Sequence, residues 1–342
     1  MKILFLPGTY SGPAANFRYF QLKPSLIENN IQCYQIVLFP RRTFYLNNMF
    51  LNKLFSLIRI IHAVILIPIL PFFDAVVSIR DILPNNRVFF LESLYRIFSR
   101  KYISDFDDTF FNGEKKNKAI HTIKNSSKVV VGNAYLADFV KRHNSNITII
   151  PTVIDTNLFK AIDRPMINRH EIPIIVWTGS KGTREKHLPI IWPILDQLSS
   201  IFEFKFRVIA DSSPFGHFKT DYETEFIKWD KDDPTNGLRD ASIGIMPLVK
   251  EDFELGKCGF KLIQYGAVGL PSIATNWGVN NEIILDGVNG FLCDADDDWI
   301  DRLATLLNDT YLCKFQGINA RQRVVEFYSL NVAIEKWIEV LK

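Results

Sequence analysis

The chain contains only four cysteines, and they are scattered along its 342 residues. Cys33, Cys258, Cys293 and Cys313 form no CxxC pair, which argues against a zinc site and against a disulfide framework. The six histidines show no metal-ligand spacing, so we assign them no role and predict no metal site. This composition suits a reducing compartment, and we therefore expect a cytoplasmic protein.

An excess of one charge is also missing. Lys and Arg number 40 against 37 Asp and Glu, which gives a net charge of +3. The basic residues are dispersed rather than interleaved with aromatic residues on one face, so nucleic acid is not an expected partner. No low-complexity tract or internal repeat is visible, and 47% hydrophobic with 23% charged residues is typical of a soluble globular protein.

The sequence also lacks an obvious membrane span or leader. The apolar run Leu57–Phe73 is shorter than the roughly 20 residues that spanning requires, contains Arg59 and His62, and is broken by Pro68 and Pro71. We expect a core helix that ends near Pro68, then a turn into a buried strand. The opening MKILFLPGTY lacks the length and cleavage site of a signal peptide and is interpreted as the first strand.

Residues 41–73 also suit peripheral contact with an anionic membrane on the inner face of the cell. Basic side chains are interleaved there with aromatic and aliphatic ones, a composition typical of interfacial segments. The core helix and the membrane contact are compatible alternatives. The basic residues are Arg41, Arg42, Lys53 and Arg59, and the apolar ones are Phe44, Tyr45, Phe50, Leu51 and Phe55.

Short apolar runs recur along the chain with helical stretches between most of them, which predicts parallel α/β sheets. The length suits two domains, and we place the linker between Ile150 and Pro165, where helical periodicity is absent. The predicted domains are 1–155 and 166–325, with a terminal helix over 326–342. The predicted strands are 3–6, 32–37, 75–79, 102–103, 128–131 and 147–150, then 174–177, 206–210, 226–229, 243–246, 272–275 and 290–293.

The most informative stretch is residues 256–278, GKCGFKLIQYGAVGLPSIATNWG. Its two leading glycines let a ligand approach the backbone closely, and the N-terminus of the helix expected from about Gly259 to Val268 attracts anions. Lys257, Lys261 and Gln264 follow at three- and four-residue intervals, on the helix face away from the core. We therefore expect a diphosphate ligand.

This segment resembles the donor-binding core of glycosyltransferase family 4, in particular bacterial members reading GKCGxKLLQYMAxGxP. The similarity extends to ILFLPGTYSGPAANFRYFQL at the N-terminus, ISDFDDTF at 103–110, VVVGNAYLADFV at 129–140, VWTGS at 176–180 and IGIMPL at 243–248. Only the region from about 39 to 75 lacks a counterpart.

The resemblance implies the GT-B fold, in which two Rossmann-like domains face each other across a cleft. It implies that the second domain binds a nucleotide-diphosphate sugar, that the first binds a saccharide or lipid-linked acceptor, and that the last helix packs back on the first domain. It also implies transfer with retention of configuration. We expect no cofactor, because a helix dipole and lysines would replace a metal ion at the leaving diphosphate.

Donor-side residues follow from the resemblance. Gly179 and Ser180 would approach the donor phosphates; the family's usual Arg is replaced by Ser180, whereas Lys186 matches the family's Lys. Trp229 would lie where the nucleotide base binds. Gln264 replaces a Glu that holds the ribose. The positions Cys258, Gly259 and Lys261 complete the predicted donor site.

The upstream Glu of the family's E-x7-E pattern would fall at Gly256. Its role in orienting the sugar would therefore pass to Glu251, Asp252 or Glu254.

Acceptor-side candidates lie in the first half. Asp105, Asp107 and Asp108 follow a predicted strand closely, and neighbouring carboxylates raise one another's pKa, which suits acid or base chemistry. An N-cap or a solvated turn is the alternative role for them. We predict Asp107 or Asp108, with Lys257, as catalytic residues. Gly12, Arg18, Gln21 and Arg80 are the predicted acceptor-binding residues.

The sequence therefore predicts a glycosyltransferase that acts in cell-surface polysaccharide or glycoconjugate synthesis. A GT-B nucleotide-sugar epimerase or phosphorylase, or a non-catalytic nucleotide-sugar binder, would share the fold. A nicotinamide enzyme is disfavoured, because the first strand is not followed by GxGxxG.

Overall fold

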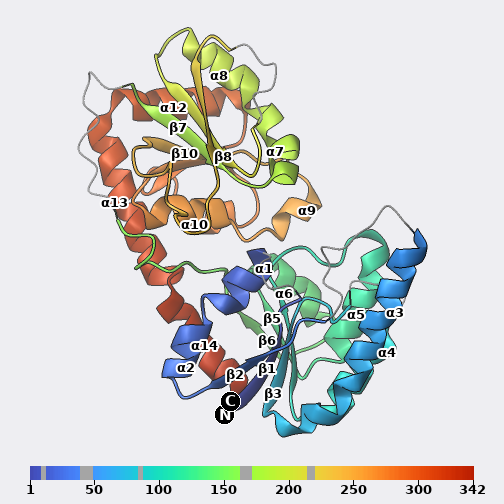
Figure 1. Cartoon of the computed structure of the whole chain (residues 1–342). Coiled ribbons are helices and arrows are strands. Elements are labelled where there is room, and N and C mark those ends of the chain that lie inside the picture. The colour runs from blue at the N-terminus through green and yellow to red at the C-terminus, as the bar shows by residue number, and fades with distance from the viewer. Residues whose placement is uncertain (9–12, 39–48, 84–87, 162–171, 214–219) are drawn as a thin grey trace. The chain divides into compact units, whose positions relative to one another are not determined.

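The twelve apolar runs predicted as strands coincide with the twelve strands in the described part of the computed structural model. The structure describes residues 1–8, 13–38, 49–83, 88–161, 172–213 and 220–342 (Figure 1). These form two units. Unit 1 comprises Met1–Thr152, Gly256–Cys258 and Leu330–Lys342, and unit 2 comprises Val153–Leu255 and Gly259–Ser329. The difference from the predicted ranges that matters most is the assignment of Gly256–Cys258 to unit 1.

Unit 1 is built on a six-stranded sheet in which all neighbouring strands are parallel. Their order is β2-β1-β3-β4-β5-β6, so the chain reverses its direction of travel across the sheet between β1 and β3. The strands are β1 (Lys2–Leu6), β2 (Gln32–Gln35), β3 (Ala75–Ile79), β4 (Tyr102–Phe106), β5 (Lys128–Val131) and β6 (Ile147–Ile149).

Helices connect these strands. The C-terminal helix α14 also belongs to unit 1, where Lys101 Nζ donates to Leu341 O at 3.4 Å and Trp337 is buried. The helical elements are α1 (Pro13–Ala15), the π-helical η1 (Asn16–Phe20), α2 (Lys23–Glu28), α3 (Met49–Ile65), the 3-10 helices η2 (Ile67–Phe72) and η3 (Gly113–Lys115), α4 (Phe90–Phe98), α5 (Lys116–Lys124), α6 (Ala134–Lys141) and α14 (Leu330–Leu341).

Unit 2 has a second six-stranded parallel sheet, with the order β12-β11-β10-β7-β8-β9 and its reversal between β7 and β10. Its strands are β7 (Ile174–Thr178), β8 (Lys205–Ala210), β9 (Glu223–Lys228), β10 (Ile243–Met246), β11 (Ser272–Thr275) and β12 (Gly290–Cys293). Its helices are α7 (Lys181–His187), the 3-10 helix η4 (Leu188–Ile190), α8 (Trp192–Ser199), α9 (Asp252–Leu255), α10 (Phe260–Ala267), α11 (Asn280–Ile283), α12 (Asp296–Asn308) and α13 (Thr310–Phe327).

Strand β4 is longer than predicted, and Asp105 lies inside it rather than in the following loop. Its side chain is fully buried. A charged residue inside a buried strand requires a partner, because an unpaired charge is costly to desolvate. That partner, Arg18, lies 87 residues earlier in the chain.

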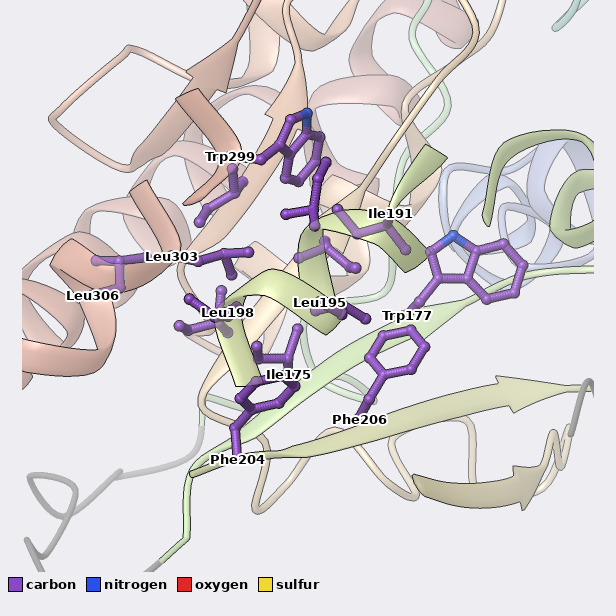
Figure 2. Close-up of a cluster of buried hydrophobic side chains, with 14 of the residues drawn as sticks. Ile175, Trp177, Ile191, Leu195, Leu198, Phe204, Phe206, Trp299, Leu303 and Leu306 are labelled. Carbon is purple, nitrogen blue, oxygen red and sulfur yellow. The ribbon is translucent and has the colours of Figure 1, made fainter. Parts of the chain in front are cut away.

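One core of unit 2 is formed where α8 and α12 pack on a face of the sheet (Figure 2). Leu195 and Leu198 of α8 meet Leu303 and Leu306 of α12, and aromatic side chains from the strands fill the space beside them. The residue most relevant to the site is Trp177, which is buried near the carboxyl end of β7. This core therefore fixes the strand from which the first loop of the site emerges.

The opposite core contains α10 and α13. Tyr265 of α10 packs over Gly244, where a Cβ would lie 2.5 Å from its ring. Its hydroxyl accepts a hydrogen bond from Thr178 N at 3.0 Å and donates one to Ile245 O at 3.2 Å. Tyr265 thereby ties α10 to the ends of β7 and β10.

Helix α13 covers a further side of α10. A Cβ on Gly266 would lie 2.8 Å from Val324 Cγ2, so the two helices approach closely. Gln264 of the same helix is only 7% exposed. The predicted open face with Lys257, Lys261 and Gln264 is therefore wrong for Gln264.

The apolar segment Leu51–Phe72 is long and apolar enough, by length and composition, to cross a membrane, which corrects the expectation that the run is too short. It forms α3 and η2, and its helix ends at Ile65, close to the predicted end near Pro68. One side packs in the core of unit 1, through Ala63, Ile67 and Leu70. Other side chains of the segment are exposed, so the expectation of a core helix describes only one of its faces.

We predict that Tyr265→Phe lowers the free energy of unfolding of unit 2 by about 1–3 kcal/mol, because it leaves the buried Thr178 N–H without its acceptor. Urea denaturation measures this change. Tyr311→Phe is the matched control, since Tyr311 is 73% exposed on α13 in the same unit, and its change should stay within about 0.5 kcal/mol. Equal effects of the two substitutions would contradict the assigned role of the hydroxyl.

Candidate functional site

In unit 2 the loops after β7 and β10 emerge side by side, because these two strands pair in register at Ile243 with Ile175. Ligands of open parallel sheets bind at the carboxyl edge where the strand order reverses. The loop after β7 contains Gly179 and Ser180, and Ser180 precedes the first turn of α7. The topology thus places the predicted phosphate loop at the expected edge, independently of any motif.

The start of α10 is shaped by Gly259. Its φ of +63° lies in the left-handed region, and a Cβ there would lie 2.3 Å from Ile283 Cδ1. Both observations require glycine at this position. Leu262 N and Ile263 N already donate to Gly259 O, so the first turn of α10 is well formed and presents the positive end of its dipole.

Gly179 brings the β7 loop against α10. A Cβ on Gly179 would lie 2.9 Å from Lys261 Cε and 2.7 Å from Trp177 Cη2. The Lys261 ammonium lies 5.3 Å from the centroid of the Trp177 ring, within range of a cation–π interaction. The absence of a side chain at 179 therefore allows a cation to lie next to the loop predicted to bind phosphates.

Lys186 lies between two carboxylates. Its Nζ is 2.8 Å from Glu251 Oε2 and 2.8 Å from Glu254 Oε1, and hydrogen bonds to these two groups raise the pKa of Lys186. Glu254 is buried, and His187 Nε2 lies 3.6 Å from the same oxygen. Because Val249 N donates to His187 Nδ1, the proton of a neutral imidazole lies on Nε2, facing Glu254.

Glu254 is thus the buried member among the three acidic residues considered for the sugar, Glu251, Asp252 and Glu254. His187 was assigned no role from the sequence, and no metal-ligand spacing marks it. The available signal is its adjacency to Lys186 at the end of α7. Sequence alone does not reveal that α9 brings a carboxylate to both of these residues.

Trp229 directly follows β9, and its N–H donates to Ala210 O at 2.8 Å, which extends the strand ladder. Its side chain is 41% exposed, so it is not a core tryptophan. It stands at the carboxyl edge of the sheet. The Gln264 side chain, in contrast, is mostly buried, as are most residues of α10.

In unit 1 the reversal of strand order lies between β1 and β3, and Arg80 follows β3 directly. Arg80 has a φ of +64°, a conformation that non-glycine residues rarely adopt. Two hydrogen bonds hold it there, from Arg80 N to Asp105 O at 2.8 Å and from Ser78 Oγ to Arg80 O at 2.7 Å. Such enforced strain is typical of functional positions.

Each of the three clustered carboxylates has its own basic neighbour. Asp105 forms a buried bidentate pair with Arg18, and Arg80 Nε donates to Asp107 Oδ1 at 2.9 Å. Burial raises the pKa of Asp108, and the nearby Lys257 ammonium opposes this rise. Asp108 also accepts a hydrogen bond from Thr109 N at 2.9 Å. Burial raises the pKa of Asp105 and of Asp108, and the charge of Asp107 adds to both rises, as expected from the sequence, while the basic neighbours oppose them.

Arg18 is 2% exposed, and its guanidinium also donates to Ile150 O at 2.7 Å. These contacts favour a positioning role for Arg18 and leave Arg80 as the more accessible guanidinium, with its side chain 42% exposed. Gln21 donates to Phe17 O at 2.8 Å at the end of η1. Gly12 lies outside the described residues.

Lys257 and Cys258 belong to unit 1. Asn133 Nδ2 donates to Lys257 O at 3.0 Å, while Asn133 Oδ1 accepts from Leu136 N and caps α6. Gly256 is tightly packed as well, since a Cβ there would lie 2.0 Å from Thr109 Oγ1. Asn133 was not singled out from the sequence; the available signal is an Asn directly before a helix, the preferred N-cap residue.

Among the described residues, no group of three or more His, Cys, Asp or Glu side chains is placed to hold a metal ion.

We predict that Arg18→Met destabilises unit 1 by about 3–5 kcal/mol, because it leaves the buried Asp105 carboxylate unpaired. Arg100→Met is the matched control, since Arg100 forms an exposed pair with Asp74 that should contribute no more than about 1 kcal/mol. Urea denaturation compares the two variants. Similar losses in both would show that the Arg18–Asp105 pair is not the constraint we infer.

The match to a known protein family covers mainly unit 2. Residues 172–309, which lie in unit 2 apart from Gly256–Cys258, match the family model described as Glycosyl transferases group 1. No curated protein sequence matches the chain.

Solved structures match over nearly the whole length. Sucrose-phosphate synthase from Thermosynechococcus elongatus superposes with a TM-score of 0.74 at 13% identity, covering 99% of this chain and 98% of that one. Anabaena HepE, solved with UDP and glucose, gives 0.69 at 16% identity, covering 100% and 99%. The apo form of the lipopolysaccharide outer core galactosyltransferase WaaB gives 0.70 at 14% identity, covering 100% and 99%. The chain therefore has the GT-B fold, and its residues 172–309 are similar to group 1 glycosyltransferases.

Proposed function

We propose that this protein is a glycosyltransferase that moves a sugar from a nucleotide-diphosphate sugar to a saccharide or lipid-linked acceptor. The observation that carries the proposal is the juxtaposition of Gly179, Gly259 and Lys261 at the strand-order reversal of unit 2. A glycine-containing loop beside a helix N-terminus and an ammonium group suits a diphosphate. This edge lies within the stretch that matches the group 1 glycosyltransferase family.

On the donor side, Ser180 and the first turn of α7 approach the phosphates, together with Cys258 and Gly259. Trp229 offers an exposed ring and strand backbone for the base. Gln264 can donate to and accept from a ribose diol through its amide. Lys186 shares the buried Glu254 carboxylate with His187, and we assign Glu254 the task of orienting the donor sugar.

In the chemical step, negative charge builds on the leaving diphosphate as the glycosidic carbon becomes oxocarbenium-like. Lys257 and Lys261 and the N-terminal dipole of α10 stabilise this charge, so they act on the transition state more than on the bound donor. Lys257 precedes the first residue of α10 by three positions in the sequence. We propose a metal-independent reaction with retention of configuration, as the family resemblance implies.

On the acceptor side, Arg80 is poised by its strained backbone and by Asp107 to bind an anionic or hydroxyl-rich acceptor. Asp107 and Asp108 are the proposed polar catalysts, and the raised pKa of Asp108 suits proton transfer. Arg18 holds Asp105 and thereby the end of β4 in place. Gly12 and Gln21 remain proposed acceptor contacts.

The structural neighbours support this class of reaction. HepE has been solved with UDP-glucose, and WaaB is a lipopolysaccharide galactosyltransferase. We propose by analogy that the present protein works in the cytoplasm, at the inner face of the membrane, in surface polysaccharide or glycoconjugate synthesis.

The first expected result is selective thermal stabilisation by one nucleotide diphosphate or its sugar conjugate. UDP, GDP and dTDP and their common sugar conjugates would be compared with NAD as a control. A ligand at 100 times its dissociation constant stabilises the folded state by about 2.7 kcal/mol, which shifts the melting temperature measurably. A response to NAD alone, or to none of these compounds, contradicts the proposed donor site.

The second expected result concerns Lys257→Ala. We predict a fall in kcat of about 10²- to 10³-fold with a much smaller change in donor affinity, because the charge it stabilises develops only in the transition state. Release of the nucleotide diphosphate measures turnover, and melting shifts measure affinity. Lys205→Ala is the control, since Lys205 begins β8 at the opposite edge of the unit 2 sheet and pairs with Glu223. Unchanged turnover in Lys257→Ala would remove Lys257 from the mechanism.

A further inference from the structure

The outer side of α3 and η2 carries an apolar stripe. Exposed hydrophobic side chains recur along it at three- and four-residue spacing, which places them on one face of a helix. Ile65 is 66% exposed and Phe72 is 74% exposed. The full stripe consists of Leu54, Leu57, Ile61, Val64, Ile65, Ile69 and Phe72.

The inner side of the same segment is firmly packed. Ala63, Ile67 and Leu70 lie in the core that also contains Leu91 and Tyr95 of α4. The Tyr95 hydroxyl donates to Ala63 O at 2.9 Å. The part of the segment from Ala63 to Leu70 cannot cross a bilayer without leaving this core.

Helix α4 also carries exposed apolar side chains. The figure places α3 and α4 on the same flank of unit 1, and the shared core shows that they are in contact (Figure 1). Ile97 is 71% exposed and Phe98 is 45% exposed, at the end of α4. Two neighbouring helices therefore both expose large apolar side chains. A run of exposed apolar side chains such as the stripe on α3 and η2 marks an interaction site.

Basic side chains are exposed on the helices that carry this surface. The sequence has no acidic residue between Glu28 and Asp74, and Glu92 of α4 is buried. Lys53 of α3 and Arg96 of α4 are exposed. Of the acidic side chains near this surface, the partly exposed Asp74 is paired with Arg100 at 3.2 Å. An apolar strip with a basic border is complementary to a bilayer whose headgroups are anionic.

We propose that the exposed face of α3, η2 and α4 docks the protein on an anionic lipid bilayer, with these helices lying in the plane of the interface. This surface would hold the enzyme at the membrane that contains a lipid-linked acceptor. In that respect the proposal rests on the proposed function. The stripe, from Leu54 to Phe72, lies within the range 41–73 expected from sequence, and the proposal adds α4 to it. Arg41, Arg42, Phe44 and Tyr45 lie outside the described residues.

The geometry favours a bilayer over a second protein. Helix α3 alone is about 25 Å long at 1.5 Å per residue. The stripe follows this length with aliphatic and phenylalanine side chains. Specific protein interfaces, in contrast, combine an apolar centre with placed polar groups and favour Tyr, Trp and Arg within it.

Co-sedimentation with vesicles tests the proposal on the full chain, without nucleotide or acceptor. Vesicles of phosphatidylcholine alone would be compared with vesicles containing about one third phosphatidylglycerol. We expect binding to the anionic vesicles that weakens with added salt. The double variant Leu57→Glu/Ile61→Glu should weaken this binding more than about tenfold, because it puts two charges on the apolar stripe.

The matched control is Ile201→Glu/Leu285→Glu, which changes two exposed apolar side chains of unit 2. It should bind vesicles like the unmodified chain. All four positions are exposed, so both variants should keep the melting temperature of the unmodified protein. If Leu57→Glu/Ile61→Glu does not fold, slower hydrogen exchange over 51–72 on adding anionic vesicles to the unmodified chain is the result expected instead.

Three outcomes would overturn the proposal. The unmodified protein could fail to bind any vesicle, or the Leu57→Glu/Ile61→Glu variant could bind as well as the unmodified chain. Light scattering could also show a dimer that this variant abolishes, which would assign the surface to a second copy of the chain. None of these outcomes affects the donor site, because the melting experiments contain no lipid and the vesicle experiments contain no nucleotide.

Discussion

Every paired strand in the two described sheets is parallel to its neighbour, and this constraint organises the rest of the structure. Parallel strands need a crossover after each strand, so all carboxyl ends of a sheet meet at one edge and all chemistry-bearing loops gather there. Reversal of the strand order then opens a crevice at one point of that edge. Gly179 and the start of α10 lie at that point in unit 2, and Arg80 lies at it in unit 1. The apolar sheets thus determine where the polar groups must act.

Because the loops gather at one edge, they also concentrate charge near low-dielectric cores. Oppositely charged side chains pair there. Asp105 is paired with Arg18, Asp107 with Arg80, and Glu254 with Lys186. A buried charge without a partner would be costly, so these pairs are requirements of the fold as much as of the chemistry. They also pre-position cationic groups, which need not reorganise when an anionic substrate arrives.

Sequence patterns predicted a run that overlaps each described strand, and they did so most directly for the central strands, which are buried on both faces and are short apolar runs. The pattern failed where burial depends on a distant partner. Strand β4 was cut short at Asp105, whose counter-ion Arg18 comes from a remote helical turn, and Gln264 was placed on a face away from the core although it is only 7% exposed. Periodicity also did not show which side of α3 is packed, because this helix is apolar on every side. The glycine-led start of α10 was predictable, because its glycines and lysines suggest an anion site from the local sequence alone. The carboxylate shared by Lys186 and His187 was not predictable, because the fold brings it to them from another element.

Unit 1 is assembled from three separate stretches of sequence, and the last of them supplies α14 with Trp337 buried among earlier residues. During translation, residues 1–152 leave the ribosome long before residues 330–342 are made. At about 5–20 residues per second, synthesis of the intervening segment takes about 10–35 s. For that time the surface that α14 covers stays open, and unit 2 can finish first. The N-terminal half of the chain therefore completes its fold only after residues 330–342 have been made.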